Sequence, residues 1–246
     1  MNSQNVIALD GVAYSGKSTI ASALARLTGY SYVNTGHMYR AVAKMVLDKS
    51  GAADLLDEAR VLKVARSMTI QFQNKKGHLK TMINGKDWTH ALDQYEVIQG
   101  ATRVATHSKV RDLLTGWQRD FLGRQMLIME GRDIGTTVFP GARWKFFITA
   151  SLAVRAKRMV QMMSSSEKRT APPLAVLMKR VNSIDERDRS RKVSPLRIAR
   201  DAILYDNSEI PSPEQDALIL HYYLRRAGEI LKNSKKLKNK FKNLKV

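Results

Sequence analysis

The segment GVAYSGKS, residues 11–18, constrains the fold of this chain more than any other stretch of its sequence. It has the spacing of a phosphate-binding loop, G-x-x-x-x-G-K-[ST], in which glycines let the backbone curl until several N–H groups point into one concavity. A short apolar run precedes the loop at residues 6–9, and apolar residues at helical spacing follow it. Strand, glycine loop and helix in this order predict a nucleotide site on an α/β core, with a chance match in a strand-turn-helix unit as the alternative.

The residue types inside the loop predict separate contacts with a nucleotide. Lys17 is expected to reach the terminal phosphates, and Ser18 to bind Mg²⁺. Tyr14 stands where many nucleotide kinases carry a glycine. We expect a negative φ at Tyr14, because a bulky residue at positive φ is strained, and a ring that points away from the phosphates.

The rest of the chain predicts a parallel sheet with an insertion. Four further short apolar runs predict strands at residues 30–33, 126–129, 144–149 and 202–205. Helical patterns separate these runs, which favours parallel strands covered by helices on both faces. Between about residues 68 and 90, apolar and polar residues alternate within the segments TIQFQ and HLKTMI, and NKKG joins the two segments. A small antiparallel sheet is therefore expected there. The polar segment 164–173 is expected to be a mobile loop.

Length and composition favour a globular protein of 246 residues, either one α/β domain with insertions or two small domains. The chain has no cysteine, which excludes disulfides and thiolate metal sites. No apolar run approaches the ~20 residues of a membrane span, and Asp10 breaks the short apolar stretch near the N-terminus, so a cytoplasmic protein is expected.

A net charge of +20 indicates polyanionic partners, either nucleic acid or the phosphates of small nucleotides. Residues 225–246 hold nine Lys/Arg and one acid. A solvated, partly disordered end is the favoured interpretation of this stretch, because its single aromatic residue after position 231 gives poor base stacking. A nucleic-acid-binding protein that acts through this tail is the alternative.

Three other stretches, NTGHMYRAVA, MEGRDIGTTVFP and ERDRSRKVSPL, set an arginine beside a turn-forming or capping residue. Arg132 and Asp133 directly follow a predicted strand, where ligands bind in open α/β sheets. Arg132 can bind a phosphate and Asp133 can accept from an exocyclic amine. Taken singly, each stretch also fits a structural role: an ion pair in a turn, an arginine that extends to solvent, or a solvated helix face.

Together these motifs resemble those of the bacterial cytidylate kinases, a family of nucleoside monophosphate kinases, over about residues 5–230. LDGVAYSGKST is similar to the family's IDGPAGSGKST, TGHMYR to TGAMYR, EGRDIGTTVFP to EGRDIGTVVFP and INGKDWT to NGEDVT. VRDLLTGWQRDF, SPL and LYDNS also match family motifs. The resemblance implies transfer of the γ-phosphate of ATP to CMP or dCMP with Mg²⁺, by a protein that is typically a monomer. A phosphate-loop kinase of another small acceptor is the closest alternative.

The resemblance also implies a role for individual residues. Those implied to hold ATP are Gly11, Val12, Ala13, Tyr14, Ser15, Gly16, Lys17, Ser18 and Thr19. Those implied to bind CMP are Thr35 and Arg40 on the monophosphate side, Thr102, Arg111 and Asp133 at the base, Asp188 at the sugar, and Arg132 and Arg191 at phosphates. Lys17, Arg132 and Arg191 are implied to be catalytic. Arg155 and Arg158 are weaker candidates.

The implied fold is the three-layer α/β fold of phosphate-loop nucleoside triphosphatases with five parallel strands, in a single domain that spans residues 1–231. Its core covers about 1–35, 106–154 and 192–231. An inserted monophosphate-binding part covers about 36–105 and a mobile lid about 155–191, and the basic tail is 232–246.

Four positions depart from the family: Val12 replaces a proline, Tyr14 a glycine, His37 a small residue, and Ile184 the arginine of the lid motif R-D-x-x-D. Arg187 is the candidate to replace that arginine.

Overall fold

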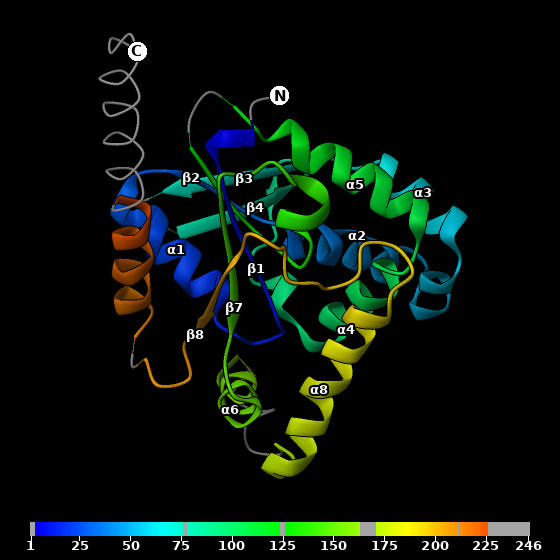
Figure 1. Ribbon diagram of the computed structural model, residues 1–246. Helices are drawn as coiled ribbons and strands as arrows, with labels where there is room; N and C mark the ends of the chain where they lie inside the picture. The colour runs from blue at the N-terminus through cyan, green and yellow to red at the C-terminus, as the bar shows by residue number, and fades with distance from the viewer. Residues whose placement is uncertain (1–2, 76–77, 124–125, 163–170, 211, 226–246) are drawn as a thin grey trace, which may run out of the picture.

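The computed structural model describes residues 3–75, 78–123, 126–162, 171–210 and 212–225 (Figure 1). Its centre is a five-stranded parallel sheet in the order β2-β6-β1-β7-β8. The strands are β1 (Val6–Gly11), β2 (Ser31–Asn34), β6 (Leu127–Glu130), β7 (Trp144–Thr149) and β8 (Ile203–Asp206). The five predicted strands are therefore confirmed, with bounds that differ by no more than two residues.

The remaining elements surround this sheet. The helices are α1 (Lys17–Thr28), α2 (Thr35–Ser50), α3 (Glu58–Arg66), α4 (Tyr95–Val104), α5 (Ser108–Asp120), α6 (Leu152–Met162), α8 (Leu174–Ser190) and a last helix described over 213–225. Short helical turns are η1 (Ser3–Asn5), η2 (Ala52–Leu56), η3 (Ala91–Asp93) and the π-helical η4 (Ile134–Val138). A second sheet contains β3 (Ile70–Lys75), β4 (His78–Ile83) and β5 (Lys86–Asp87).

Helices cover both faces of the parallel sheet, as predicted. On one face Leu9 packs with Leu24 of α1 and Leu220 of the last helix. On the other face Ala8 packs with Ile134 and Val138 of η4. All six residues of β1 are buried, which explains why this strand reads as an apolar run rather than an alternating one.

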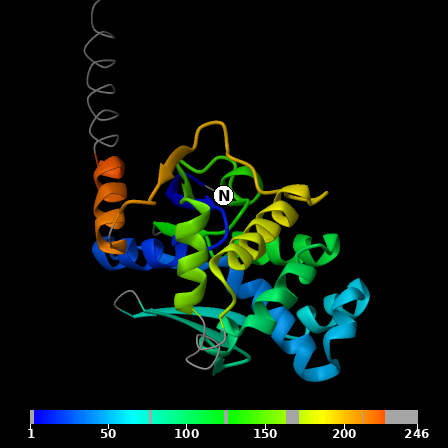
Figure 2. The same cartoon turned by 90° about the horizontal axis from the view of Figure 1, so that it is seen from below.

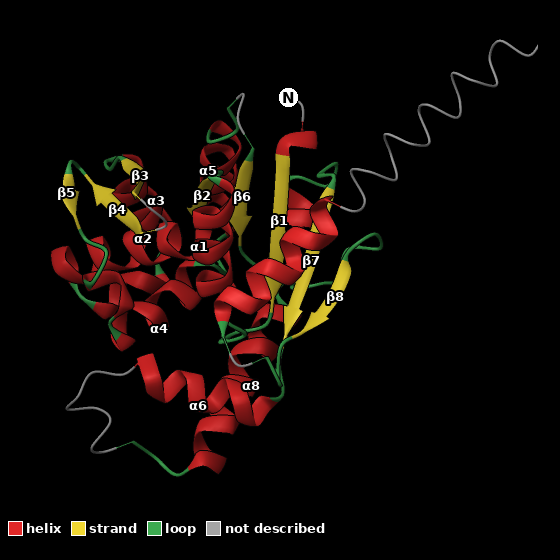
Figure 3. Ribbon diagram, turned by 90° about the vertical axis from the view of Figure 1, so that its left-hand side faces the viewer, coloured by secondary structure: helices red, strands yellow, loops and turns green. Residues whose placement is uncertain are grey.

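The predicted antiparallel pair is confirmed, since β3 and β4 pair in antiparallel register and β5 adds a short third strand. Together with α2, α3, α4 and part of α5 these strands enclose a separate apolar core that includes Val46, Val61, Ile83 and Leu114. Figure 3 shows this body beside the parallel sheet. The side chain of Thr81, within β4, is fully buried and makes a hydrogen bond with His37 of α2, so polar contacts also join the strands to the helices.

Helices α6 and α8 pack against each other through Ala156, Met159, Leu177 and Val181. They lie at the end of the molecule where β1 runs into the glycine loop (Figures 1 and 3), and Figure 2 views the molecule from that end. Residues 164–170 of the predicted mobile loop, and the tail 232–246, lie outside the described residues. Among the described helices there is none that is long and apolar enough to cross a membrane.

Candidate active site

The loop after β1 takes the shape that its glycines allow. Gly11 has a φ of 152°, and a Cβ added there would lie 2.0 Å from the carbonyl oxygen of Ile148 in β7. Gly16 has a φ of 88° and directly precedes α1. Both conformations favour glycine, so the first and last glycines of the motif fix the entry and exit of the loop. The N-terminal N–H groups of α1 complete a site for an anion.

Lys17 is buried and folds back onto its own loop. Its ammonium group donates to the Val12 carbonyl oxygen at 2.6 Å and to Ser15 Oγ at 3.1 Å. Burial, assisted by the positive charge of Arg132, lowers the pKa of Lys17 to about 7. Because a bound phosphate adds negative charge beside the ammonium group, an anionic ligand would favour the protonated form of Lys17.

The prediction of a negative φ at Tyr14 is wrong: its φ is +56°, in the left-handed region. The loop therefore requires at this position the conformation that a glycine adopts without strain. The tyrosine ring packs against the apolar side chains between α6 and α8, and the residue lines the cavity described below. Val12 is buried against Phe147 and Leu196, away from that cavity.

Two buried carboxylates lie at the ends of neighbouring strands. Glu130, the last residue of β6, accepts from Ser18 Oγ at 3.1 Å and from the Tyr32 hydroxyl. Asp10, near the end of β1, accepts from the backbone N–H groups of Ile134 and Gly135 at 2.8 and 2.7 Å. Burial raises the pKa of Asp10 to about 6, so Asp10 supports the turn after β6 as a carboxylate at neutral pH.

A buried ion pair lies on the far side of the site. Arg111, on α5, and Asp133, after β6, are 2% and 6% exposed, and 2.5 Å separates Arg111 Nη2 from Asp133 Oδ2. The Arg111 guanidinium also lies 5.4 Å from the centre of the Tyr39 ring. Nε of Arg111 is buried and has no hydrogen-bond partner in the described part of the chain. Thr102 turns its hydroxyl to the Gln99 carbonyl at 2.7 Å.

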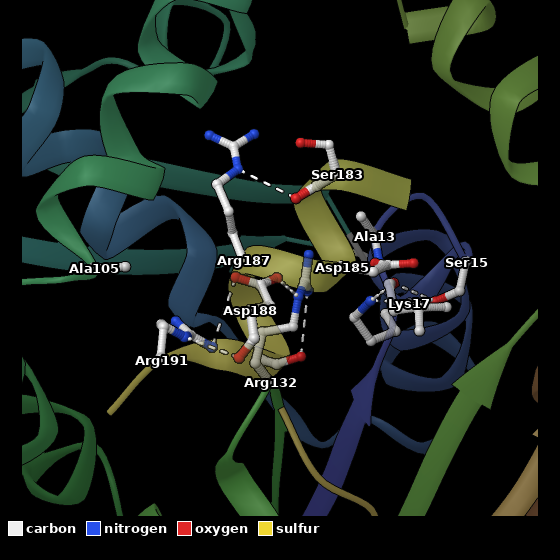
Figure 4. Close-up of polar contacts among 12 residues, drawn as sticks. Ala13, Ser15, Lys17, Ala105, Arg132, Ser183, Asp185, Arg187, Asp188 and Arg191 are labelled. Atoms are coloured by element: carbon white, nitrogen blue, oxygen red, sulfur yellow. Dashed lines mark hydrogen bonds and ion pairs between the residues drawn. The ribbon is translucent and has the colours of Figure 1, made fainter. Parts of the chain in front are cut away.

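Two arginines meet on Asp188 (Figure 4). Arg132 Nε donates to Asp188 Oδ2 at 2.8 Å, and Arg191 Nε donates to the Asp188 carbonyl at 3.2 Å. Arg191 Nη2 is a further buried donor that lacks a hydrogen-bond partner among the described residues. Nearby, Thr35 donates to the Glu130 carbonyl at 2.7 Å, and Arg40 pairs with Asp93 at 2.5 Å.

One cavity of about 790 Å³ joins these parts. All eight residues implied to bind CMP line it, and so do all the implied ATP residues except Gly11 and Val12. Glu130, at the carboxyl end of β6, and the loop that follows β1 line it, at the edge of the sheet where ligands bind in open α/β sheets. Among the described residues no group of three or more His, Asp or Glu side chains is arranged to hold a metal ion.

The family model for cytidylate kinases matches residues 7–223 of this chain. The chain belongs to the cytidylate kinase family. A cytidylate kinase of Lactiplantibacillus plantarum is 39% identical over 213 residues, which cover 87% of this chain and 92% of the relative. Cytidylate kinase 1 of Haemophilus influenzae is 35% identical over 220 residues, 89% of this chain and 94% of the relative. The cytidylate kinase of Caldanaerobacter subterraneus subsp. tengcongensis is 36% identical over 208 residues, 85% and 89% of the two chains.

Helix α8 of this member of the cytidylate kinase family differs from the family's motif R-D-x-x-D at Ile184. Ile184 is 6% exposed and lines the cavity, so an apolar side chain stands where the family motif has an arginine. Arg187 does not replace that arginine here. It donates to the Ser183 carbonyl at 3.2 Å (Figure 4) and to Thr102 Oγ1 at 3.3 Å. Arg187 is not among the residues that line the cavity.

The two weaker arginine candidates lie in different surroundings, one inside the cavity and one outside it. Arg158 lines the cavity and donates to the Ser15 carbonyl at 3.1 Å and to Asn207 Oδ1 at 3.0 Å. Arg155 is buried outside the cavity, in an ion pair with Asp185 at 2.6 Å. Arg158 is therefore the better candidate for contact with ATP.

The interpretation of the sequence missed Glu130 and Asn207 as site residues. Glu130 ends a strand, and a polar residue at the end of a buried apolar run was the available signal. Asn207 lies in the LYDNS motif, directly after β8, and its Nδ2 donates to the Ser15 carbonyl at 3.0 Å. Only the strand order brings both residues to the loop after β1.

Proposed function

We propose that this chain transfers the γ-phosphate of ATP to CMP or dCMP, giving ADP and CDP or dCDP. The observation that carries the proposal is the single cavity lined by the phosphate loop at one end and by the Arg111–Asp133 pair at the other. A loop that cradles phosphates and a buried site for a base, joined in one space, suit a reaction between two nucleotides.

The Arg111–Asp133 pair would read the cytosine ring. A carboxylate can accept from the exocyclic amine of cytosine, which uracil lacks, as acidic side chains do when they recognise cytosine. Arg111 can donate its unpartnered Nε–H to the base, and Thr102 also lines the cavity. A pyrimidine therefore satisfies a buried donor that the ligand-free protein leaves without a partner.

Lys17, Arg132 and Arg191 would stabilise the transferring phosphate. Phosphoryl transfer needs alignment and charge neutralisation rather than a covalent intermediate. All three cations line the cavity, and Asp188 holds the two arginines in place through its side chain and backbone. Arg40 and Thr35 would bind the acceptor monophosphate, and Asp188 the sugar.

The residues around Ser18 fit Mg²⁺. The Ser18 hydroxyl and the Glu130 carboxylate are hard oxygen donors 3.1 Å apart, and Mg²⁺ binds through one or two such groups together with the phosphates of its nucleotide. When bound, the ion neutralises the developing charge on the phosphate oxygens. Ser18 and Glu130 would hold it at the start of α1.

Closure of α6 and α8 over the cavity would exclude water, which otherwise hydrolyses ATP. These helices supply Arg158, Asp188 and Ile184 to the cavity wall, which supports a lid at about residues 155–191. The inserted part at about 36–105 supplies Arg40 and Thr102, which supports an acceptor-binding role. The proposal includes a cytoplasmic location, since ATP is the phosphate donor, and a monomer, which is typical of the cytidylate kinases that the chain resembles.

The proposal predicts the outcome of an ADP-release assay with ATP, Mg²⁺ and one acceptor at a time. CMP and dCMP should support turnover at least tenfold faster than UMP, AMP or GMP, because uracil has no exocyclic amine for Asp133 and the purines are larger than the pyrimidine ring that the Arg111–Asp133 pair would bind. Turnover with a different acceptor alone would favour another phosphate-loop kinase. Salt-sensitive nucleic-acid binding without turnover would favour the basic tail as the functional element.

Glu130→Gln is expected to raise the Mg²⁺ concentration for half-maximal rate by about tenfold, because the variant loses a negative charge next to Ser18. The measurement is a Mg²⁺ titration of the ADP-release rate at saturating ATP. Tyr32→Phe is the matched control, since it removes the hydrogen bond to the other oxygen of Glu130 and keeps the charge. Equal Mg²⁺ requirements in Glu130→Gln and the parent protein would remove Glu130 from the metal site.

A further inference from the structure

Tyr14 adopts a backbone conformation that it reaches only under constraint. Its φ of +56° lies in the left-handed region, where a bulky L-residue crowds its own backbone. A strained residue persists only where its surroundings hold it, and such residues gather at functional sites. The contacts that hold Tyr14 therefore bear on how the phosphate loop works.

The ring of Tyr14 is held by the two helices of the lid. It packs on a buried apolar cluster built from Ala156 and Met159 of α6 and from Leu177 and Val181 of α8. These helices lie more than 130 residues further along the chain than the loop. A residue of the phosphate loop thus belongs to the apolar core between the lid helices.

The same two helices also bind the backbone of the preceding residue. The N–H of Ala13 donates to Asp185 Oδ1 at 2.8 Å, and the carbonyl of Ala13 accepts from Arg155 Nη1 at 3.2 Å. Arg155 of α6 and Asp185 of α8 are themselves paired at 2.6 Å and buried. Figure 4 shows Ala13 beside Asp185, on the side of α8 that faces the loop. Two consecutive loop residues therefore contact both helices.

We infer that Tyr14 is a positioning residue that couples the shape of the phosphate loop to the packing of α6 against α8. While the helices are packed, apolar contacts of the ring offset the strain in the backbone. When the helices separate, those contacts are lost and the strain favours a different loop shape. The coupling is reciprocal, so a nucleotide that selects the present loop shape also favours packed helices.

This inference rests on the proposed function for the identity of the nucleotide, and it assigns to the tyrosine a role that a glycine cannot have. A glycine at position 14 adopts positive φ without strain, so the loop shape would no longer depend on the helices. Three substitutions separate the ring from the strain. Tyr14→Phe keeps both, Tyr14→Gly removes both, and Tyr14→Ala removes the ring and keeps the strain.

The test is amide hydrogen exchange of peptides covering residues 152–162 and 174–190, in the full-length protein with and without the non-hydrolysable ATP analogue AMP-PNP and Mg²⁺. In the parent protein and Tyr14→Phe, we expect AMP-PNP to slow exchange in both helices. In Tyr14→Gly, exchange without nucleotide should be about tenfold faster, and the slowing by AMP-PNP should fall below half of the parent value.

AMP-PNP affinity supplies the readout that a merely structural role would not produce. Tyr14→Gly should bind AMP-PNP at least as tightly as the parent protein, although its lid helices are less protected. Tyr14→Ala should bind roughly fivefold more weakly than Tyr14→Gly, because alanine keeps the left-handed penalty. The inference would be overturned if the two helices of Tyr14→Gly exchanged at the parent rate. It would also be overturned if Tyr14→Phe lost as much protection from exchange as Tyr14→Gly.

Failure of the proposed function would look different. If AMP-PNP binds but CMP supports no ADP release in the parent protein, the acceptor assignment is wrong and the exchange experiment still measures the coupling. If AMP-PNP does not bind at all, the nucleotide assignment is wrong. The exchange of the nucleotide-free variants then decides whether the Tyr14 ring holds the two helices together.

Discussion

Lys17→Ala is expected to lower the rate of phosphoryl transfer to CMP by about 10³-fold, because one fixed cation at the transferring phosphate contributes on this scale. Lys17 lines the cavity at the start of α1, where its ammonium group can turn from Val12 and Ser15 to a bound phosphate. The measurement is the ADP-release rate at saturating ATP and CMP. Lys49→Ala, at an exposed position near the end of α2, should keep the parent rate.

The stability of Lys17→Ala provides an independent check through its pH dependence. The pKa of Lys17 is about 7 in the folded protein and 10.5 in the reference state, so the unfolded chain binds more protons between these values. The parent protein should therefore lose stability as the pH falls from about 10.5 to 7, relative to Lys17→Ala. Urea unfolding at pH 7 and pH 10 measures this difference. Turnover within tenfold of the parent would contradict the role of Lys17, provided that the variant is folded.

Asp133→Ala is expected to have two effects, on stability and on the choice of base. The substitution leaves the Arg111 guanidinium buried without its partner, which costs about 3–5 kcal/mol. For a chain of this length the midpoint of thermal unfolding should fall by roughly 10 °C. The ratio of kcat/KM for CMP over UMP should fall about tenfold or more, since the acceptor for the cytosine amine is lost.

The double variant Asp133→Leu with Arg111→Met separates these two effects. It replaces the buried ion pair by apolar side chains of similar size, which often restores stability. We expect the unfolding midpoint to recover while the preference for CMP stays low. If the ratio of kcat/KM for CMP over UMP is unchanged in either variant, the ion pair has no role in base recognition, whatever happens to the midpoint of thermal unfolding.

The core of the fold was predictable because its signals are local. The apolar runs of the five strands and the glycines at both ends of the loop each lie within a few residues of the structure that they determine. The candidate site residues were predicted from motifs, and the structure gathers them around one cavity. Their individual roles, and the division of the chain into core, insertion and lid, stay predictions that the experiments above test.

The expectation for Arg187 failed and Glu130 was overlooked because both depended on distant contacts. Arg187 was the candidate to replace the missing lid arginine, but the direction of α8 turns it toward Thr102, which lies 85 residues away in the chain. Glu130 was overlooked, because its position next to Ser18 depends on β6 pairing with β1. Spacing along the chain does not encode which strands become neighbours.

The sequence by itself determined that this chain forms a strand, a phosphate loop and a helix, because glycine spacing and apolar periodicity act over short distances. Only the tertiary structure decided the conformation of Tyr14 within that loop. A tyrosine left to its local preference takes a negative φ. Its positive φ instead accompanies packing on α6 and α8, and the free energy of these nonlocal contacts exists only once the whole chain has folded.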